Sequence, residues 1–349
     1  MEDNRILAYL DHNVLDLMTK GDPHQVRELL KNNNLTPVYS DETLKEIQRS
    51  IGYECGFIEL LEEIDAKYIE PILDQNFKQT GQANIHSVLA SDTYKRFLAN
   101  QSESCSGDFG MSEILMKFYG GQSDKSFGEI FQQGSVDLQK YMMEALEGID
   151  EIALDETIDI ESIKKLIADL PALMSSQSSS VAEKLDERGE SPVSEFEAKT
   201  GIGPVILKNV KPPNVVEKIW QILSGIEGFS GIGIETFFGV KPHSFEADSD
   251  RERTIQEKVN AVYHQLNFLG YYRDSKMKKD RRFRASFSDM THAGVASFCH
   301  FFLCRDEDLV MKAAAAYEYL GVNTRILHYK ANKKMQPTAD ASADWGVAK

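Results

Sequence analysis

The sequence has few cysteines, no long apolar run and no excess of basic residues. Its 349 residues include only four cysteines, which is too few for a disulfide-built scaffold and favours a reducing compartment. No stretch approaches the roughly 18 apolar residues that a membrane-spanning helix needs. The formal net charge of −16 argues against a general polyanion binder, although it leaves room for a local basic patch.

The remaining composition is that of a globular protein. Hydrophobic residues make up 42% of the chain and charged residues 27%, which is ordinary for that class. The first residues, MEDNR, are acidic, and no cationic and apolar signal segment follows them, so we expect a cytoplasmic protein. A chain of this length can build a sizeable core, and it predicts two domains or one domain with a large insertion.

The N-terminal end shows the alternation of strand and helix that is typical of an α/β fold. An apolar run at 5–10 predicts a strand, which ends abruptly at Asp11. A second strand is predicted at 35–40, where Ser40 would serve as the N-cap of a helix over 41–51. This order indicates a parallel sheet.

The same alternation returns near the C-terminal end. We expect a helix over 288–300 that begins with Ser-Asp, and then a strand over 301–309 that ends in acids. A helix over 309–321, stopped by a glycine, and a final strand over 323–329 complete the pattern. The two ends of the chain are therefore predicted to form one parallel sheet flanked by helices, interrupted by an insertion.

The middle of the chain has a different pattern. From about 56 to 175 the apolar residues mostly follow helical spacing, and no strong strand pattern is present. Residues 175–201 are rich in Ser and Glu and predict a linker or mobile loop. We predict three regions, in which residues 1–55 and 285–330 form the core, 56–284 form a mostly helical insertion, and 331–349 form a disordered tail.

Four acids stand where predicted strands end or helices begin, namely Asp11, Glu46, Asp289 and Asp306. Ligands of parallel sheets bind outside the carboxyl ends of the strands. Carboxylates that converge there repel one another unless a cation lies among them. Oxygen ligands without a Cys or His cluster favour Mg²⁺ or Mn²⁺. For any one of these acids alone, helix capping is the simpler explanation.

Three segments carry a family resemblance: AYLDHNVLD, PVYSDETLKEI, and FSDMTHAGVASFCHFFLCRDEDLVMKAAAAYEYLGVNTRIL. Together they resemble the PIN domain, a metal-dependent nuclease fold, at residues 5–50 and 285–329. The resemblance implies an endoribonuclease whose acidic centre consists of the four residues Asp11, Glu46, Asp289 and Asp306. Two features depart from the family pattern. Cys304 stands where Thr or Ser is usual, and the stretch between the second and third acids is far longer than usual.

The resemblance also implies roles for the individual acids. Asp11, Asp289 and Asp306 would bind the Mg²⁺ or Mn²⁺ ion, and Glu46 would orient water. Asn13 would support the site, and Asp308 would either support it or be a solvated loop charge. At the start of a helix, Asp289 would be kept ionised by the helix dipole.

A basic segment, RDSKMKKDRRFR at 273–284, precedes the third acid. Its basic side chains could dock the phosphates of an RNA substrate, and neighbouring aromatic rings could stack on bases. The basic side chains are Lys278, Lys279, Arg281, Arg282 and Arg284, and the aromatic ones are Tyr271, Tyr272 and Phe283. The alternative is a solvated, flexible loop.

The competing hypothesis is a non-catalytic PIN-fold interaction protein that binds RNA or a protein partner through the insertion. The sequence leaves open which RNA is cut, whether a protein inhibitor binds, and whether the chain forms a homo-oligomer; no membrane partner is expected.

Other features predict no further site. His292, three residues after Asp289, could lie over the site, but a position on a helix surface or a half-buried one is commoner, and Glu42 is expected to be solvated. The Gly-rich stretches at 201–204 and 228–239 lack a phosphate-loop pattern. Cys299 and Cys304 have no second cysteine pair with which to bind zinc.

Overall fold

The computed structural model describes residues 5–103, 108–149, 159–188, 191–229, 231–242 and 251–330. The chain forms two compact units. Unit 1 consists of residues 1–97, 202–274 and 285–349, and unit 2 consists of residues 98–201 and 275–284. Unit 1 therefore contains both ends of the chain together with two stretches that the sequence analysis had assigned to the insertion, 56–97 and 202–274.

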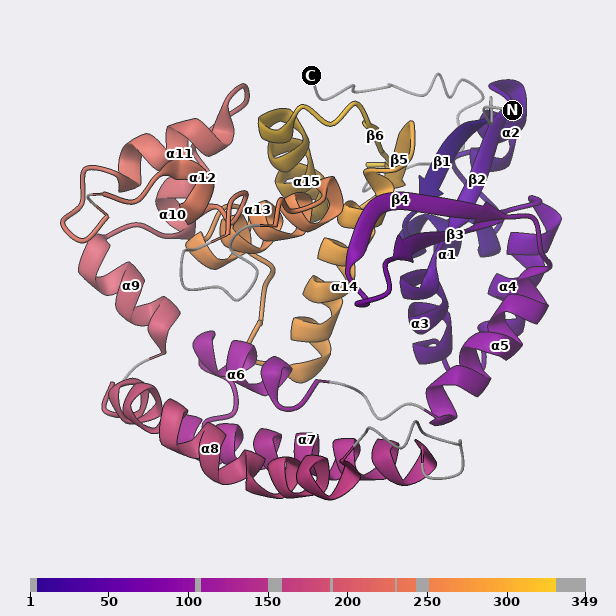
Figure 1. Ribbon diagram of the computed structural model, residues 1–349. Coiled ribbons are helices and arrows are strands. Elements are labelled where there is room, and N and C mark those ends of the chain that lie inside the picture. Colours follow the sequence, from indigo (N-terminus) through magenta and orange to yellow (C-terminus); the bar gives the residue numbers. More distant parts are fainter. Residues whose placement is uncertain are drawn as a thin grey trace. The chain divides into compact units, whose positions relative to one another are not determined.

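The centre of unit 1 is a mostly parallel sheet, as predicted (Figure 1). Its strands follow the order β4-β3-β2-β1-β5-β6, and only the β3–β4 pair is antiparallel. Within the described residues its six strands are β1 (Ile6–Leu10), β2 (Leu35–Tyr39), β3 (Lys67–Leu73), β4 (Gln79–His86), β5 (Phe301–Cys304) and β6 (Arg325–His328). The two ends of the chain thus meet in one sheet.

The central strand, β1, is apolar because both of its faces are covered. Tyr9 is aligned with Val38 of β2 on one side and with Phe302 of β5 on the other. All three side chains are buried. A strand that is buried on both faces favours the near-continuous apolar run that the sequence shows here.

The order of the strands reverses at β1. From β1 the chain builds β2 and β3 on one side, and it later returns to build β5 and β6 on the other. In open parallel sheets, the crevice outside the carboxyl ends of the strands at such a reversal is the usual place for a ligand. Asp11, which directly follows β1, lies at this point.

Helices cover this sheet and fill the rest of unit 1. Helix α1 contacts β5, and helix α3 contacts β2. Helix α15 contacts both β6 and α13. The helices of unit 1 are α1 (His12–Thr19), α2 (Val26–Asn32), α3 (Asp41–Arg49), α4 (Glu54–Glu63), α10 (Pro204–Leu207), α11 (Val215–Leu223), α12 (Ile234–Phe237), α13 (Ile255–Leu269) and α15 (Glu307–Leu320). Two more, α5 (Ala90–Glu103) and α14 (Asp280–Ala296), continue from one unit into the other.

Unit 2 is helical in the part that the structure describes. It contains α6 (Met111–Phe118), α7 (Phe127–Ile149), α8 (Ile160–Asp186) and α9 (Pro192–Thr200). Helices α7 and α8 pack against each other through a small core that includes Ile130 and Ala182. At one end, the Asp186 carboxylate accepts hydrogen bonds from the backbone N–H groups of Phe127 and Gly128, which begin α7.

Several predicted elements are wrong. The segment 57–73 was expected to be helical throughout, but α4 ends at Glu63 and β3 follows, paired with β4. The strand pattern was hidden because Pro71 lies at an irregularity in β3 and because the edge strand β4 is mostly polar. The predicted linker 175–201 is largely helical, since α8 and α9 occupy most of it.

The helix that carries Asp289 also differs from the prediction. It begins at Asp280 rather than at residue 288, so that Asp289 lies in its interior. Other elements agree with the sequence analysis: Ser40 is the N-cap of α3, and Gly321 ends α15 in the left-handed conformation. The predicted tail, 331–349, lies outside the described residues. In the described part of the chain, we find no helix with both the length and the apolar character of a membrane span.

Candidate metal centre

Asp11 is buried at the carboxyl end of the central strand. The residue is 1% exposed, and its backbone N–H donates a hydrogen bond to the Leu303 carbonyl of β5 (3.0 Å). Although Asp11 is the N-cap residue of α1, its side chain makes no capping hydrogen bond. Its Oδ2 accepts from the Asn13 amide (3.2 Å), whereas its buried Oδ1 has no hydrogen-bond partner among the described residues. Capping therefore does not explain this carboxylate.

The charge on Asp11 is poorly compensated. The pKa of the Asp11 carboxyl is raised to about 6, mainly by burial. The charges of Glu46 and Asp306 also act to raise the pKa, whereas His292 acts to lower it. Asn13 stabilises the ionised form of Asp11 through its hydrogen bond. A buried carboxylate oxygen with no partner is costly unless a cation or a proton balances it.

Helix α3 brings Glu46 to the same place. The Thr43 hydroxyl accepts from the Ser40 backbone N–H (3.3 Å) and so holds the first turn of the helix. One turn further along, Glu46 Oε2 lies 2.9 Å from His292 Nε2. Burial acts to raise the pKa of Glu46, but the neighbouring imidazole outweighs it and the pKa is lowered. Glu46 is therefore an ionised, half-buried carboxylate.

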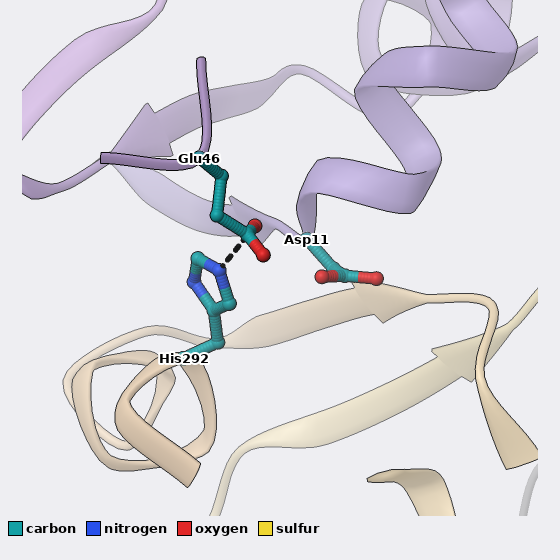
Figure 2. A group of neighbouring side chains, drawn as sticks. All are labelled: Asp11, Glu46 and His292. Carbon is teal, nitrogen blue, oxygen red and sulfur yellow. Dashed lines mark hydrogen bonds and ion pairs between the residues drawn. The ribbon is translucent and has the colours of Figure 1, made fainter. Parts of the chain in front are cut away.

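His292 is fully buried beside Asp11 and Glu46, whereas a position on a helix surface or a half-buried one was the commoner expectation. It is 0% exposed, and a candidate ligand atom of His292, one of Asp11 and one of Glu46 all lie within 4.8 Å of one another (Figure 2). Burial acts to lower its pKa, but Tyr9, Glu46 and Asp11 together raise the pKa well above the ordinary value. His292 thus compensates part of the negative charge of these acids.

A second hydrogen bond fixes the other nitrogen of this ring. His292 Nδ1 lies 2.7 Å from the Tyr9 hydroxyl, which in turn lies 2.7 Å from the Ser40 hydroxyl. Tyr9 belongs to β1 and its ring packs against Phe302 of β5. The imidazole is consequently held in one orientation by the central strands, with Nε2 directed toward the carboxylates (Figure 2).

Asp289 lies one turn before His292 on α14 and is half-buried. Its pKa is raised well above the ordinary value by burial and by Asp11, Asp274 and Asp306. The expectation that a helix N-terminus would keep Asp289 ionised is therefore wrong, because the residue lies in the helix interior. Asp11 and Asp289 are far apart in the sequence, but the charge of Asp11 raises the pKa of Asp289. Asp289 is not part of the group whose ligand atoms lie within 4.8 Å of one another.

Asp306 is exposed and is the N-cap of helix α15. Its Oδ1 accepts from the backbone N–H groups of Asp308 (2.8 Å) and Leu309 (3.1 Å), so the simple capping explanation holds for this oxygen. Its charge nevertheless raises the pKa of both Asp11 and Asp289. Asp308 is half-buried, and burial followed by Asp306 raises the pKa of its carboxyl.

A buried lysine lies beside the acids on helix α15. Lys312 is 0% exposed, and its Nζ donates to Asp274 Oδ2 (2.7 Å) and to Asn267 Oδ1 (3.1 Å). It also lies 4.8 Å from the centre of the Tyr263 ring and lowers the pKa of Asp289. Lys312 was not among the predicted site residues, although a charge in an apolar, alanine-rich helix is a signal that could have pointed to it.

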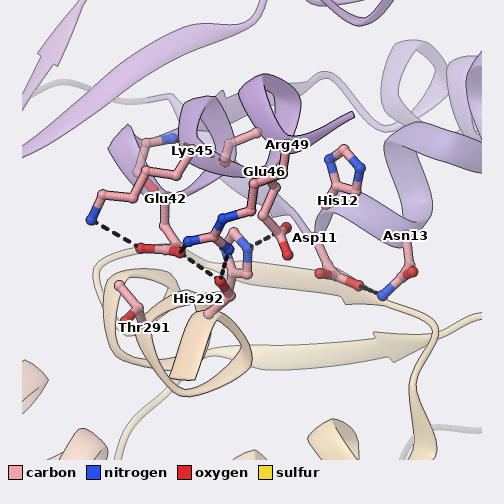
Figure 3. A network of polar contacts seen from close by, with 12 residues as sticks. Asp11, His12, Asn13, Glu42, Lys45, Glu46, Arg49, Thr291 and His292 are labelled. Atoms are coloured by element: carbon pink, nitrogen blue, oxygen red, sulfur yellow. Dashed lines mark hydrogen bonds and ion pairs between the residues drawn. The ribbon is translucent and has the colours of Figure 1, made fainter. Parts of the chain in front are cut away.

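A further carboxylate network adjoins the site (Figure 3). Glu42, which was expected to be solvated, is buried, and its Oε1 accepts from the Ser288 hydroxyl (2.6 Å). Lys45 and Arg49 lie on either side of the same carboxylate, at 3.3 and 3.9 Å. Burial acts to raise the pKa of Glu42. The charges of Lys45, His292 and Arg49 and the hydrogen bond from Ser288 outweigh burial, so the pKa of Glu42 is lowered. Glu42 is therefore fully partnered, unlike Asp11.

The basic segment falls in unit 2, apart from its first two residues. Lys278, Lys279, Arg281, Arg282 and Arg284 are exposed, as an RNA-contacting role requires. The aromatic residues beside them are not available for base stacking, since Tyr271 is 0%, Tyr272 9% and Phe283 1% exposed. Their apolar rings are instead part of the packed interior, which is the usual fate of aromatic side chains.

The donor set fits a divalent cation. Asp11 contributes an unpartnered buried oxygen, and ligand atoms of Glu46 and His292 lie within 4.8 Å of it. Asp289 and Asp306 are outside this group, although their carboxylates and that of Asp11 affect one another's pKa. Carboxylate oxygens with an imidazole nitrogen are ligands of Mn²⁺ and related ions.

Searches with the chain against protein-family models, curated proteins and solved structures found no match.

Proposed function

We propose that this protein is a divalent-metal-dependent endoribonuclease with a PIN-like core, acting in the cytoplasm. The observation that carries the proposal is the Asp11 carboxylate, which is buried, without a partner on Oδ1 among the described residues, and repelled by Glu46, Asp289 and Asp306. Natural proteins retain such an arrangement at functional sites. Its place, where the strand order reverses, is the usual position of a ligand in this type of sheet.

The residues of the chain would divide the work as follows. Asp11 and Asp289 would hold the Mg²⁺ or Mn²⁺ ion, and Asp306 would complete the set. When bound, the ion supplies a Lewis acid that stabilises negative charge on the phosphate and makes a water more acidic. Asn13 keeps the Asp11 carboxylate in place, and Glu46 orients the water.

The experiment that tests this proposal is cleavage of a panel of structured and single-stranded RNAs in Mn²⁺, with wild type and Asp289→Asn compared. We expect wild type to cut at least one RNA and Asp289→Asn to cut none. The variant should still fold, because Asn resembles the protonated carboxyl that burial favours. Asp92→Asn makes the same chemical change at an exposed, paired carboxylate and should retain cleavage. Equal activity in wild type and Asp289→Asn would contradict the proposal and point to a contaminating ribonuclease.

One observation favours the alternative of a non-catalytic interaction protein. His292 already supplies a positive charge between Asp11 and Glu46 in the absence of metal. A site that is balanced by this imidazolium would need no ion. In that case Mn²⁺ would not stabilise the protein against heat, and no RNA in the panel would be cut.

The basic segment gives a separate prediction about RNA binding. Arg281 and Arg282 are exposed, and neither forms an ion pair in the part of the chain that the structure describes, whereas Arg284 is paired with Asp280. Both lie in the first turn of α14, where the helix dipole disfavours cations. We expect Arg281→Gln/Arg282→Gln to weaken RNA binding by about tenfold at low salt and to flatten its dependence on salt concentration.

The matched control for this experiment is Lys165→Gln/Lys184→Gln. It removes the same charge from exposed positions of α8 in the same unit. Binding can be followed by fluorescence anisotropy with a labelled single-stranded RNA at several salt concentrations. If both double variants weaken binding equally, the effect comes from net charge and not from this segment.

A further inference from the structure

We infer that His292 is a nitrogen ligand of the metal ion and that it makes the site select Mn²⁺ over Mg²⁺. This inference rests on the proposed metal site and deepens it. The family resemblance implies oxygen ligands only, so His292 enters on the geometry alone. It is the one His among the described residues that lies together with two carboxylates at ligand distance.

The distances between the ligand atoms of Asp11, Glu46 and His292 are close to those around a shared ion. Two ligand atoms bound about 2.1 Å from one ion lie at most about 4.2 Å apart. The ligand atoms of Asp11, Glu46 and His292 are already within 4.8 Å of one another. Only a small contraction is therefore needed for the three to share an ion.

The second ring nitrogen of His292, Nδ1, has a buried hydrogen-bond partner. A histidine that binds a metal through one nitrogen almost always donates a hydrogen bond from the other, which fixes the ring. His292 Nδ1 has such a partner in the buried Tyr9 hydroxyl, and Tyr9 is itself fixed by Ser40. With Nδ1 donating to Tyr9, and Tyr9 donating to Ser40, the lone pair of Nε2 is free to bind a metal.

The unpartnered oxygen of Asp11 provides a further ligand atom for the ion. Asp11 Oδ1 is buried and has no partner within the described ranges, so it offers a lone pair to an ion without giving up a hydrogen bond. Glu46 Oε2 already lies 2.9 Å from His292 Nε2. An ion placed among these atoms would replace the proton that now joins His292 to Glu46.

An imidazole nitrogen among the ligand atoms favours Mn²⁺ over Mg²⁺. Imidazole is a good ligand for the first-row transition metals, whereas Mg²⁺ prefers oxygen donors and retains its waters. A site with Asp11, Glu46 and a fixed imidazole should therefore bind Mn²⁺ more tightly than Mg²⁺. An oxygen-only site built from the aspartates alone would discriminate less.

The test uses the full-length protein, freed of metal by chelation, and begins with wild type. Pulsed electron paramagnetic resonance of the Mn²⁺-loaded protein should show coupling to a directly bound nitrogen, and labelling the histidines with ¹⁵N should change that coupling. Because this measurement uses wild type, it does not depend on whether a variant folds. Mn²⁺ that binds with no nitrogen coupling would overturn the inference.

Titration calorimetry with Mn²⁺ and with Mg²⁺ gives a second readout. We expect His292→Asn to lower the Mn²⁺ affinity by at least about tenfold and to change the Mg²⁺ affinity far less. His264→Asn is the matched control, since His264 belongs to the same unit and contacts the ring of Phe287 instead of the acids. Equal loss of both metals, or no loss of Mn²⁺ affinity, would count against His292 as a ligand.

These outcomes separate the inference from the proposed function. If wild type binds neither Mn²⁺ nor Mg²⁺, the metal-dependent nuclease itself is refuted. If wild type binds Mn²⁺ and cuts RNA without nitrogen coupling, the nuclease stands and only the role of His292 is wrong.

Discussion

Asp11→Asn is expected to abolish the stabilisation of the protein by Mn²⁺ and, at the same time, to make the metal-free protein more stable at neutral pH. The variant removes a buried, unpartnered carboxylate oxygen and its repulsion by Glu46 and Asp306. A pKa of about 6 for Asp11 corresponds to an unfavourable ionisation free energy of about 2–3 kcal/mol at neutral pH. RNA cleavage should be lost together with the Mn²⁺ response.

The pH dependence of this effect has a definite sign. The pKa of Asp11 is higher in the folded protein than in the unfolded chain, so the folded state binds the proton more tightly. Metal-free wild type should therefore lose stability as the pH rises from about 4 through about 6, and Asp11→Asn should lack this part of the loss. The two proteins should be most alike in acid and most different above about pH 6.5.

Denaturant unfolding in chelator, at an acidic and at a neutral pH, measures this difference. Asp16→Asn is the control, because Asp16 is a partly exposed acid on the adjoining helix that pairs with Lys20. A second set of melts with Mn²⁺ should raise the stability of wild type and of Asp16→Asn but not of Asp11→Asn. A normal Mn²⁺ response in Asp11→Asn would remove Asp11 from the metal site.

Lys312→Met is expected to destabilise the protein by about 3–5 kcal/mol, the cost of leaving a buried charge without its partner. Met retains most of the apolar length of the lysine but leaves Asp274 without the cation that now lies 2.7 Å away. The change also removes the positive charge that lowers the pKa of Asp289. The acids of the site would then repel one another more strongly.

A double variant distinguishes charge from packing. Asp274→Asn added to Lys312→Met removes the uncompensated carboxylate while keeping a polar group beside Ser286 and Asn267, and it should recover most of the lost stability. Lys258→Met is the control, since Lys258 pairs with the exposed Glu252 and should cost far less. If the double variant is as unstable as Lys312→Met alone, lost packing and not lost charge is the cause.

Much of the sheet could be predicted from local sequence. The apolar run before Asp11 is a strand because both faces of the central strand are buried, and such burial requires consecutive apolar residues. Ser40 and Gly321 marked the ends of α3 and α15 because capping depends on the adjacent backbone alone. The α/β class and the position of Asp11 at the end of β1 follow from features of this kind.

Strands β3 and β4 and the helices within 175–201 were not predictable in the same way. Pro71 and the polar edge strand carry no strong period, and pairing with a neighbouring strand is what holds them in the sheet. The Ser-rich part of α8 has middling helix propensity, but Ala182 and Leu185 pack against α7. In both cases a contact with a distant segment outweighs local preference.

The sequence by itself determined the types of side chain available and where the regular elements of the two ends begin and stop. Only the tertiary structure decided which charges meet. It buried His292 between Asp11 and Glu46, placed Asp289 in a helix interior where burial raises its pKa, and paired Lys312 with Asp274. The physical reason is that desolvation and charge–charge interaction depend on distance in space, and residues far apart along the chain become neighbours only when the sheet brings its two ends together.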